Sequence, residues 1–172
     1  QMEQLLFRQA RASDLPRIVQ IIRQAQAQMR ALGSDQWQDG YPAPADIEDD
    51  LAAGAGYVLC RAGEAEAVAY GAILFDGEPA YGAIEGRWLT EGTYAVLHRL
   101  AVADGHKRQG LAGAFVRRTE QLARERGAGS FRVDTHRDNG YMLRLISRHG
   151  FARCGTVRYR SGERIAFEKI LE

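Results

Sequence analysis

The sequence is poor in the residues that build disulfide-rich, metal-binding or membrane-spanning proteins. Its 172 residues include only two cysteines, Cys60 and Cys154, both in strand-like surroundings, so we expect reduced, buried thiols rather than a disulfide or a nucleophile. The four histidines lie far apart without ligand spacing, which disfavours a metal site. No apolar run approaches the roughly 20 residues that a bilayer span needs, and no signal peptide is visible. We therefore expect a cytoplasmic protein that does not enter membranes.

The chain also lacks an excess of charge of either sign. Its 23 basic and 22 acidic residues leave a formal net charge of +1, which argues against general binding to nucleic acid or to a membrane surface. No internal repeat, low-complexity stretch or linker stands out, and this length suits a domain that buries roughly 70% of its unfolded surface. We expect a single domain over residues 1–172, in which any anion-binding site is local.

The most informative stretch runs from Val96 to Ala114 and reads VLHRLAVADGHKRQGLAGA. Strand-forming residues end at Val102, a polar turn follows, and Gly110 opens a helix that continues to about Arg126. Unpaired N–H groups at a helix start and the helix dipole attract anions, and small residues let a ligand approach closely. The segment contains neither G-x-x-x-x-G-K-[ST] nor G-x-G-x-x-G. It therefore predicts a pyrophosphate site of another kind at the end of a strand.

This segment resembles the acyl-CoA signature of the GNAT superfamily of N-acetyltransferases. The family pattern is (Arg/Gln)-x-x-Gly-x-(Gly/Ala) after a strand that carries Leu-x-Val. Here Leu100-Ala101-Val102 supplies the strand and residues 107–112 supply the loop, with Lys107 in place of the usual Arg or Gln. In the family the backbone amides of the loop do most of the phosphate binding, and Arg108 offers an alternative side-chain contact.

A second match lies further along the chain. The stretch SFRVDT (130–135) predicts a strand, Asn139 follows at its exit, and a short helix leads to Gly150-Phe151, all at the spacing of the family's second motif. Two motifs in order identify the chain as similar to this family, most strongly from Thr93 to Phe151.

The resemblance implies an α/β fold, a three-layer αβα sandwich around a mixed, mostly antiparallel sheet of six to seven strands. It implies acetyl-CoA (coenzyme A) as the acyl donor, whose thioester a primary amine attacks directly, without an acyl-enzyme. We expect the amine to belong to a small molecule. The alternatives are a protein N-terminus or lysine as acceptor, or a non-catalytic CoA-binding module that regulates a partner. Relatives are often dimers, so a homodimer is an open option.

Periodicity and turn residues predict a mixed order of strands and helices, in which the strands over 57–61 and 66–75 form a hairpin. Ser13 and Asp14 offer N-caps for a helix that continues to about Leu32. The last strand, 164–169, alternates so that Ile165 and Phe167 face inward. The other expected strands cover 5–10, 57–61, 66–75, 93–102 and 130–135, with helices over 45–53 and 110–126 and irregular segments over 34–44 and 76–92.

The resemblance assigns the contacts to CoA to two parts of the chain. Backbone groups of Leu100 and Val102 pair with pantetheine as though it were another strand, and an N–H near Leu100 contacts the oxyanion. Asn139 hydrogen-bonds the pantetheine arm, or it caps the helix that follows, or both. The expected cofactor-binding residues are Leu100, Ala101, Val102, Lys107, Arg108, Gln109, Gly110, Leu111, Ala112, Gly113 and Asn139.

His98 is our favoured general base, beside Leu100 as the oxyanion contact. It lies two residues before Leu100 and so shares its face of a regular strand. Imidazole is well matched to taking up a proton near neutral pH, although His98 could equally be a strand residue satisfied by hydrogen bonds. Glu85 is the second candidate, because a carboxylate also attracts a cationic amine, and Asp134 and His136 come third.

The sequence departs from the family at the general acid. Many relatives carry a Tyr four residues before the Gly-Phe pair, and this position is Ile146 here, which has no proton to donate. Tyr141 or a water could substitute. The ordinary thiol pKa of about 8.5 makes the thiolate a tolerable leaving group without an acid.

Aromatic residues in the irregular segments predict the walls of an acceptor pocket. Trp37, Tyr41, Tyr81 and Trp88 could line it or stack on a cation, with Glu85 as the acidic partner, and each aromatic is equally often plain core. This mixture suits a small cationic amine.

Overall fold

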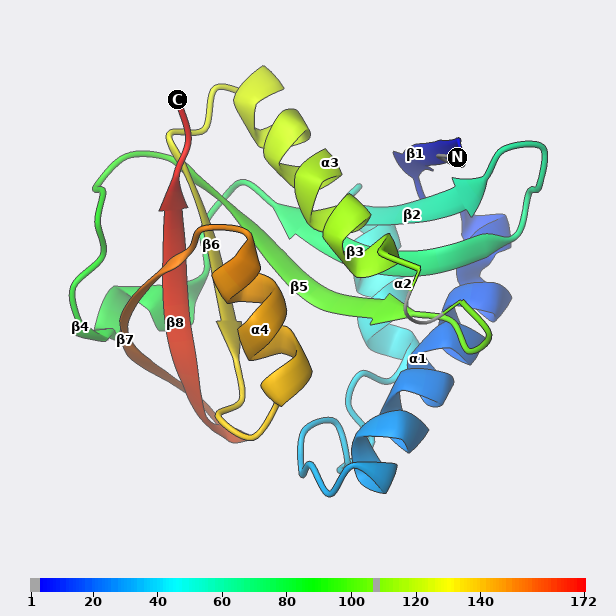
Figure 1. Cartoon of the computed structure of the whole chain (residues 1–172), viewed down its shortest axis with the longest axis horizontal. Helices are drawn as coiled ribbons and strands as arrows, with labels where there is room; N and C mark the ends of the chain where they lie inside the picture. The colour runs from blue at the N-terminus through cyan, green and yellow to red at the C-terminus, as the bar shows by residue number, and fades with distance from the viewer. Residues whose placement is uncertain (1–3, 107–108) are drawn as a thin grey trace. The chain divides into compact units, whose positions relative to one another are not determined.

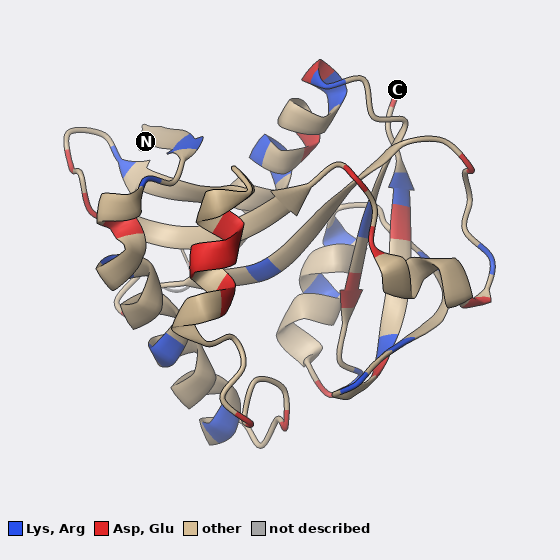
Figure 2. Cartoon of the chain, turned by 180° about the vertical axis from the view of Figure 1, so that it is seen from behind, with Lys and Arg blue, Asp and Glu red and all other residues tan. Residues whose placement is uncertain are grey.

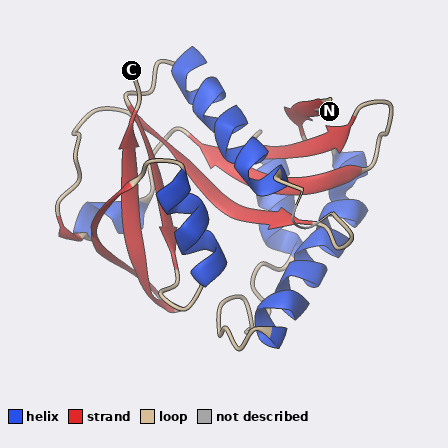
Figure 3. Cartoon of the chain, in the orientation of Figure 1, coloured by secondary structure: helices blue, strands red, loops and turns tan. Residues whose placement is uncertain are grey.

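The computed structural model describes residues 4–106 and 109–172. Over these residues it is an α/β fold with a mixed sheet of eight strands and four α-helices (Figures 1 and 3). Within them no helix is long and apolar enough to cross a membrane. The strands are β1 (Leu5–Gln9), β2 (Gly56–Arg61), β3 (Ala67–Leu74), β4 (Glu85–Gly86), β5 (Tyr94–Val102), β6 (Ser130–Thr135), β7 (Ala152–Tyr159) and β8 (Gly162–Ile170), and the helices are α1 (Leu15–Ala31), α2 (Pro44–Ala52), α3 (Leu111–Glu125) and α4 (Gly140–Arg148).

The strand order is β1-β2-β3-β5-β6-β8-β7-β4. Among the pairs whose register is resolved, β5 and β6 run parallel and the others run antiparallel. The predicted α/β class and mixed sheet are confirmed, but the sheet has eight strands rather than six to seven. A physical reason is that β4 is only two residues long and falls within residues 76–92, which lack strand periodicity.

The chain divides into two compact units, and each is described by itself. The first comprises Gln1–Ile73 and His98–Phe115, and the second Leu74–Leu97 and Val116–Glu172. Both β5 and α3 contribute residues to each unit.

In the first unit, helices cover both faces of the strands. On one face Ile18 of α1 joins a buried cluster with Val58 of β2. On the other face the ring of Phe7 stacks on Tyr57 at 5.2 Å and meets Phe115 of α3 edge-on at 5.5 Å. Adjacent positions 57 and 58 point to opposite faces, so β2 is buried on both sides.

The start of α1 agrees with the prediction in position but not in the capping contact. Asp14 is the N-cap residue, at the end of a 3-10 turn over Ala12–Asp14, but its side chain does not cap the helix. Instead the Asp14 carboxylate accepts the N–H of Arg11 at 2.7 Å and pairs with Arg8 of β1 at 2.8 Å. The Asp14 carboxylate therefore pairs with Arg8 instead of accepting a hydrogen bond from the first turn of α1.

In the second unit, the prediction that β8 alternates between an inward face with Ile165 and Phe167 and a polar outward face is only partly correct. Ile165 and Phe167 are half-buried, whereas Ala166 and Glu168 on the opposite face are completely buried. Sequence alternation assigns a glutamate to solvent, but Glu168 is paired with Arg132 of β6, and a paired charge can be buried.

The β4–β7 pair depends on two glycines. A Cβ on Gly155 would lie 2.0 Å from the carbonyl oxygen of Glu85, and one on Gly86 would lie 2.2 Å from that of Cys154. Both glycines also have positive φ angles, of 154° and 131°. Only glycine allows this backbone approach.

Candidate functional site

The segment that leads from β5 into α3 is held by side chains of α1. The N–H of Asp104 donates to Gln24 Oε1 at 2.8 Å, and Gln28 donates to the Asp104 carboxylate. A tight turn follows, in which the N–H of His106 donates to the carbonyl of Ala103 at 3.2 Å. The loop is therefore anchored to the helix before any ligand binds.

The end of β2 anchors the second half of this loop. Arg61 contacts His106 Nδ1 at 2.9 Å and donates to Gln109 Oε1. The Gln109 side chain, expected to bind the cofactor, is thus engaged within the loop. The predicted contacts of Lys107 and Arg108 lie outside the described residues.

The first turn of α3 presents the N–H groups that the sequence predicted. The N–H of Ala114 donates to the carbonyl of Gly110 at 2.9 Å, which places Leu111, Ala112 and Gly113 in the first turn. N–H groups in a first turn have no carbonyl partner inside the helix and carry partial positive charge. Gly110 has a φ of 73°, and a Cβ there would meet nothing within 4 Å, so the approach is open. These features fit a bound pyrophosphate.

The middle of β5 is irregular at the predicted catalytic residues. Arg99 has a φ of 58°, in the left-handed region, between His98 and Leu100. All three residues are half-buried, whereas Ala101 and Val102 beyond them are buried. In a regular strand, side chains two positions apart point to the same face, but a left-handed residue between them breaks this alternation. Strand geometry therefore does not require the side chains of His98 and Leu100 to share a face. The base role of His98 stays a prediction.

Arg99 is held by a carboxylate from α2. Its Nε donates to Asp50 Oδ2 at 2.8 Å and its second terminal nitrogen donates to Asp50 Oδ1 at 2.5 Å. Tyr70 of β3 donates to Asp50 at 2.6 Å, and Arg99 also donates to the Tyr41 hydroxyl at 2.7 Å. Helix α2 carries several acidic residues, visible in Figure 2, and Asp50 is the buried one.

These partners shift the pKa values of the cluster. Burial lowers the pKa of Arg99, but its hydrogen bonds to Asp50 and Tyr41 and the charges of these partners together outweigh burial, so this pKa lies above its usual value. Burial and the charge of Asp50 raise the pKa of the Tyr70 hydroxyl. Sequence reasoning missed the cluster, because nothing local indicates that an acidic residue on one helix meets Arg99.

Trp37 and Tyr41, the predicted acceptor-pocket residues of the first unit, differ in their exposure to solvent. Trp37 is 9% exposed and belongs to the core cluster with Ile18 and Ile47, which favours the plain-core alternative. Tyr41 is 39% exposed, and Gln26 of α1 donates to its carbonyl at 3.0 Å. Tyr41 is therefore the more accessible of the two.

A cavity of about 200 Å³ lies in the first unit, between α1 and the start of α2. Its lining is mostly apolar, with the polar side chains of Arg23 and Gln26, and includes no carboxylate. Such a lining does not supply the acidic partner that a cationic amine needs. The lining residues are Val19, Ile22, Arg23, Gln26, Gly40, Pro42, Ala43, Pro44 and Ile47.

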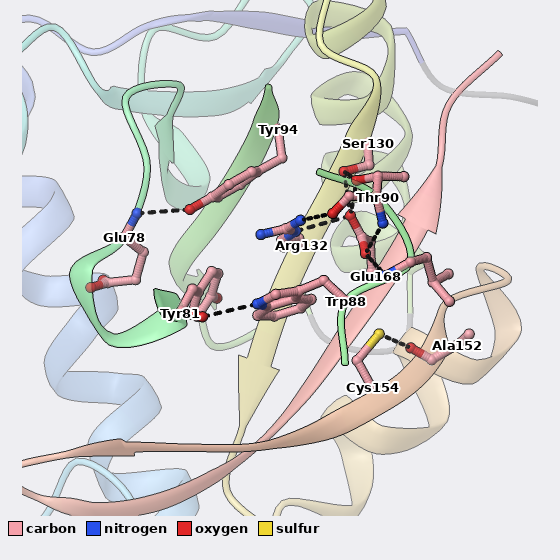
Figure 4. A network of polar contacts seen from close by, with 11 residues as sticks. Glu78, Tyr81, Trp88, Thr90, Tyr94, Ser130, Arg132, Ala152, Cys154 and Glu168 are labelled. Atoms are coloured by element: carbon pink, nitrogen blue, oxygen red, sulfur yellow. Dashed lines mark hydrogen bonds and ion pairs between the residues drawn. The ribbon is translucent and has the colours of Figure 1, made fainter. Parts of the chain in front are cut away.

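In the second unit, Glu168 is the centre of a buried hydrogen-bond network (Figure 4). Its carboxylate accepts from Ser130 Oγ at 2.5 Å, Thr90 Oγ1 at 2.6 Å and Arg132 Nε at 2.9 Å. The N–H of Leu89 adds a fourth donor at 2.6 Å. Burial raises the pKa of Glu168, but these hydrogen bonds outweigh it and the pKa lies below its usual value.

Arg132 lies between two aromatic rings. Its guanidinium carbon is 4.2 Å from the centre of the Trp88 ring and 3.9 Å from that of Tyr94. Trp88 Nε1 also donates to the carbonyl of Tyr81 at 2.9 Å (Figure 4). Trp88, expected to bind substrate, thus already stacks on a cation of the protein.

Asp134, a third-choice base, accepts two phenol hydroxyls. Tyr81 and Tyr159 each donate to its Oδ2 at 2.7 Å, and Tyr81 is 1% exposed. Burial raises the pKa of both phenols, and the charge of Asp134 raises it further. His136, the other third choice, lies 2.8 Å from Asp138 through Nδ1.

Glu85, the second-choice base, is exposed. Its carboxylate pairs with Arg158 at 2.8 Å, with 62% of the Glu85 side chain open to solvent. An exposed carboxylate beside an arginine lacks the desolvated surroundings that tune catalytic carboxylates.

The second motif has its expected local structure. Asn139 accepts the N–H of Met142 at 3.2 Å and so caps α4, which confirms the capping alternative, and its pantetheine contact stays a prediction. Ile146 is 3% exposed, whereas Tyr141 is 48% exposed. A tyrosine at position 146 would have to enter packed core.

Comparisons with known proteins agree with these features. The sequence profile of the Acetyltransferase (GNAT) family matches residues 16–151. A solved GNAT-family acetyltransferase from Streptococcus agalactiae 2603 is 34% identical over 99% of this chain and 98% of its own, with a TM-score of 0.88.

More distant solved structures share the fold. A GNAT-family acetyltransferase from Listeria monocytogenes 4b F2365 is 20% identical over 97% of this chain and 95% of its own, with a TM-score of 0.78. The ribosomal-protein-S18-alanine N-acetyltransferase of Escherichia coli is 15% identical, covers 98% and 95%, and has a TM-score of 0.68. No curated protein matches the sequence.

Proposed function

Because this chain belongs to the GNAT family of acetyltransferases, we propose that it transfers the acetyl group of acetyl-CoA to a primary amine of a small molecule. One observation carries the proposal: the loop that enters α3 is anchored by Gln24, Gln28 and Arg61, and it opens at Gly110 onto a helix N-terminus. The proposed acetyltransferase unit is one domain over residues 1–172.

Most of the proposed contacts to acetyl-CoA are made by backbone groups. The N–H groups of Leu111, Ala112 and Gly113 would bind the pyrophosphate, with Lys107 and Arg108 nearby in sequence. Backbone groups of Leu100 and Val102 would pair with pantetheine, and Asn139 would add a side-chain contact. Bound acetyl-CoA supplies an acetyl group activated as a thioester.

The chain's own residues then act on the acceptor. His98 is proposed to take up a proton from the substrate ammonium, directly or through water, so that the neutral amine can attack the thioester. The N–H at Leu100 would donate a hydrogen bond where negative charge develops, a contribution of about 2.7–4 kcal/mol for single donors of this kind. Ile146 donates no proton, so the thiolate is proposed to leave without a tyrosine at that position.

A small acceptor is favoured over a protein acceptor by the half-exposed Tyr41, whose hydroxyl is tied to Arg99 of β5. A residue held in this way restricts the space beside β5, whereas an extended peptide needs an open groove. The E. coli relative that acts on a ribosomal protein shares only the fold with this chain.

A thiol-release assay with acetyl-CoA tests the proposal. Amines, amino acids and peptides are compared as acceptors, and the acetylated product is identified by mass spectrometry. We expect stimulation by a class of small primary amines. Stimulation by peptides alone would transfer the assignment to protein acetylation, and flat release despite CoA binding would indicate a regulatory CoA-binding module.

A further inference from the structure

Arg99 adopts a backbone conformation that an arginine avoids. Its φ of 58° lies within β5, whose other residues form a strand. A left-handed conformation costs a non-glycine residue about 1–2 kcal/mol, and arginine has no short side chain to relieve it locally. Contacts elsewhere must therefore hold this conformation.

The contact that holds it is the fork between Arg99 and Asp50. Two nitrogens of Arg99 meet the two oxygens of Asp50 at 2.8 and 2.5 Å, and the two side chains are only 14% and 6% exposed. In a regular strand a change of one position turns a side chain to the other face. An extended Arg99 would therefore lose this pair and leave the Asp50 carboxylate buried without its cation.

We propose that Asp50 is a positioning residue for acetyl transfer, acting through its ion pair with Arg99. The pair fixes the left-handed residue in β5, and this residue sets the direction of the Leu100 N–H and of the His98 side chain on either side of it. Strained residues and bulges beside active sites re-aim neighbouring groups in this way. The inference rests on the proposed function, because His98 and Leu100 are its base and oxyanion contact.

The same arginine connects β5 to the predicted acceptor side. Its remaining terminal nitrogen donates to the Tyr41 hydroxyl at 2.7 Å, in the segment that precedes α2. Asp50 therefore also determines where Tyr41 is held. Removal of the Asp50 charge is expected to disturb acetyl transfer and acceptor binding, and to leave the separately anchored loop before α3 intact.

The variant Asp50→Asn tests the proposal. We expect kcat to fall about 10–100-fold, because a misplacement of reacting groups by about 1 Å can cost up to about 100-fold. The KM for acetyl-CoA should rise much less than kcat falls, because Gln24, Gln28 and Arg61 anchor the proposed pyrophosphate loop independently of Asp50, and only the proposed pantetheine contacts lie in the disturbed segment. An unchanged kcat overturns the proposal.

Asp14→Asn is the matched control. Asp14 is also buried and also pairs with an arginine in the first unit, Arg8 at 2.8 Å, but Arg8 has no positive φ. This variant should lower the melting temperature and keep kcat. An equal loss of kcat in both variants would show a general stability effect and overturn the proposal.

The double variant Asp50→Asn/Arg99→Gly separates the backbone from the ion pair. Glycine adopts a positive φ without steric cost, and the amide introduced by Asp50→Asn can still accept from the Tyr70 hydroxyl, which donates to the Asp50 carboxylate in the wild type. We expect the double variant to recover most of the kcat that Asp50→Asn loses, even if it melts at a lower temperature. A double variant no more active than Asp50→Asn overturns the role of the backbone.

Hydrogen exchange gives a readout that does not depend on activity. The amides of residues 98–102 should exchange faster in Asp50→Asn than in the wild-type protein, and Asp14→Asn should leave them unchanged. Unchanged exchange in Asp50→Asn overturns the proposal whatever the kinetics. A wild-type protein without amine-stimulated thiol release overturns the proposed function instead, and the exchange data still decide whether Asp50 fixes β5.

Discussion

At the scale of single residues, Arg99 and Arg132 are each held by one carboxylate from a different element. Arg99 meets Asp50 of α2, and Arg132 meets Glu168 of β8, with arginine side chains that are 14% and 6% exposed. Removing one partner of a buried pair leaves an uncompensated charge and costs about 3–5 kcal/mol. Exposed pairs have little effect because water solvates both groups. These two pairs, like the buried pair of Asp14 with Arg8, are therefore expected to contribute more to stability than the exposed pairs.

His98→Ala tests the proposed base. Loss of a general base lowers turnover by about 100-fold or more, so kcat for the best amine should fall by this factor near pH 7. The KM for acetyl-CoA should change little, because the loop before α3 is anchored by other side chains. Steady-state kinetics with the amine and acetyl-CoA varied separately give both constants.

His149→Ala is the control, because His149 ends α4 and has no role in the proposed chemistry. It should retain wild-type kcat. Full activity of His98→Ala would place the base on another residue.

At the scale of elements, the junction of β5, its loop and α3 combines rigidity with open access. Side chains of α1 and β2 hold the loop, and Gly110 with its φ of 73° turns the chain into the helix. Asn139 starts α4 by an ordinary side-chain cap. Both helix starts match the sequence motifs, because caps and glycine turns are local features.

Gly110→Val tests the proposed donor site. Valine strains a left-handed position by about 1–3 kcal/mol and places methyl groups in the open approach to the α3 N–H groups. We expect the KM for acetyl-CoA to rise about tenfold or more, equivalent to about 1.4 kcal/mol of binding. Isothermal titration with CoA checks the same change without turnover.

Gly63→Val is the matched control for this substitution. Gly63 has a φ of 80°, and a Cβ there also meets nothing within 4 Å, but it lies in the turn between β2 and β3. The control should lose similar stability and bind CoA normally. Equal CoA binding by both variants would refute the assignment of the loop.

At the scale of the whole molecule, Glu168 makes the free energy of unfolding decrease at acidic pH. Its pKa is lowered by its hydrogen bonds, so its stabilising contribution is present above the ordinary glutamate pKa of about 4.3. This contribution is lost as the pH falls through the lowered pKa of the folded state. Asp14, whose pKa is lowered by Arg8, acts in the same direction.

Glu168→Gln should lower the melting temperature at pH 7 by roughly 6–20 °C, from the 3–5 kcal/mol lost when a buried pair is broken. The variant should also lose less stability between pH 5 and 3 than the wild type. Glu163→Gln is the control, since Glu163 lies on the same strand with its exposed pairs to Arg137 and Arg158, and it should melt nearly as the wild type does. Parallel acid curves for Glu168→Gln and the wild type would contradict this role.

Local patterns in the sequence determined the order of helices and strands apart from the short β4, the loop before α3, the cap at Asn139 and the family resemblance. The hairpin of β2 and β3 and the strand over 130–135 are confirmed, because strand periodicity and turn residues are properties of short segments. The glycine-rich loop is equally local. For these features the neighbours in sequence are also the neighbours that decide the structure.

Only the tertiary structure decided which charges are buried and which aromatics are core. Arg99 and Asp50 are 49 positions apart in the chain, and Arg132 and Glu168 are 36 apart, so no local pattern indicates that they meet. The left-handed residue in β5 and the burial of Glu168 in β8 follow from these long-range ion pairs, and Trp37 is buried by long-range apolar packing. A charge can be buried only beside a partner of opposite charge. Strand register and helix packing bring that partner into place, and the spacing of residues in the sequence specifies neither the register nor the packing.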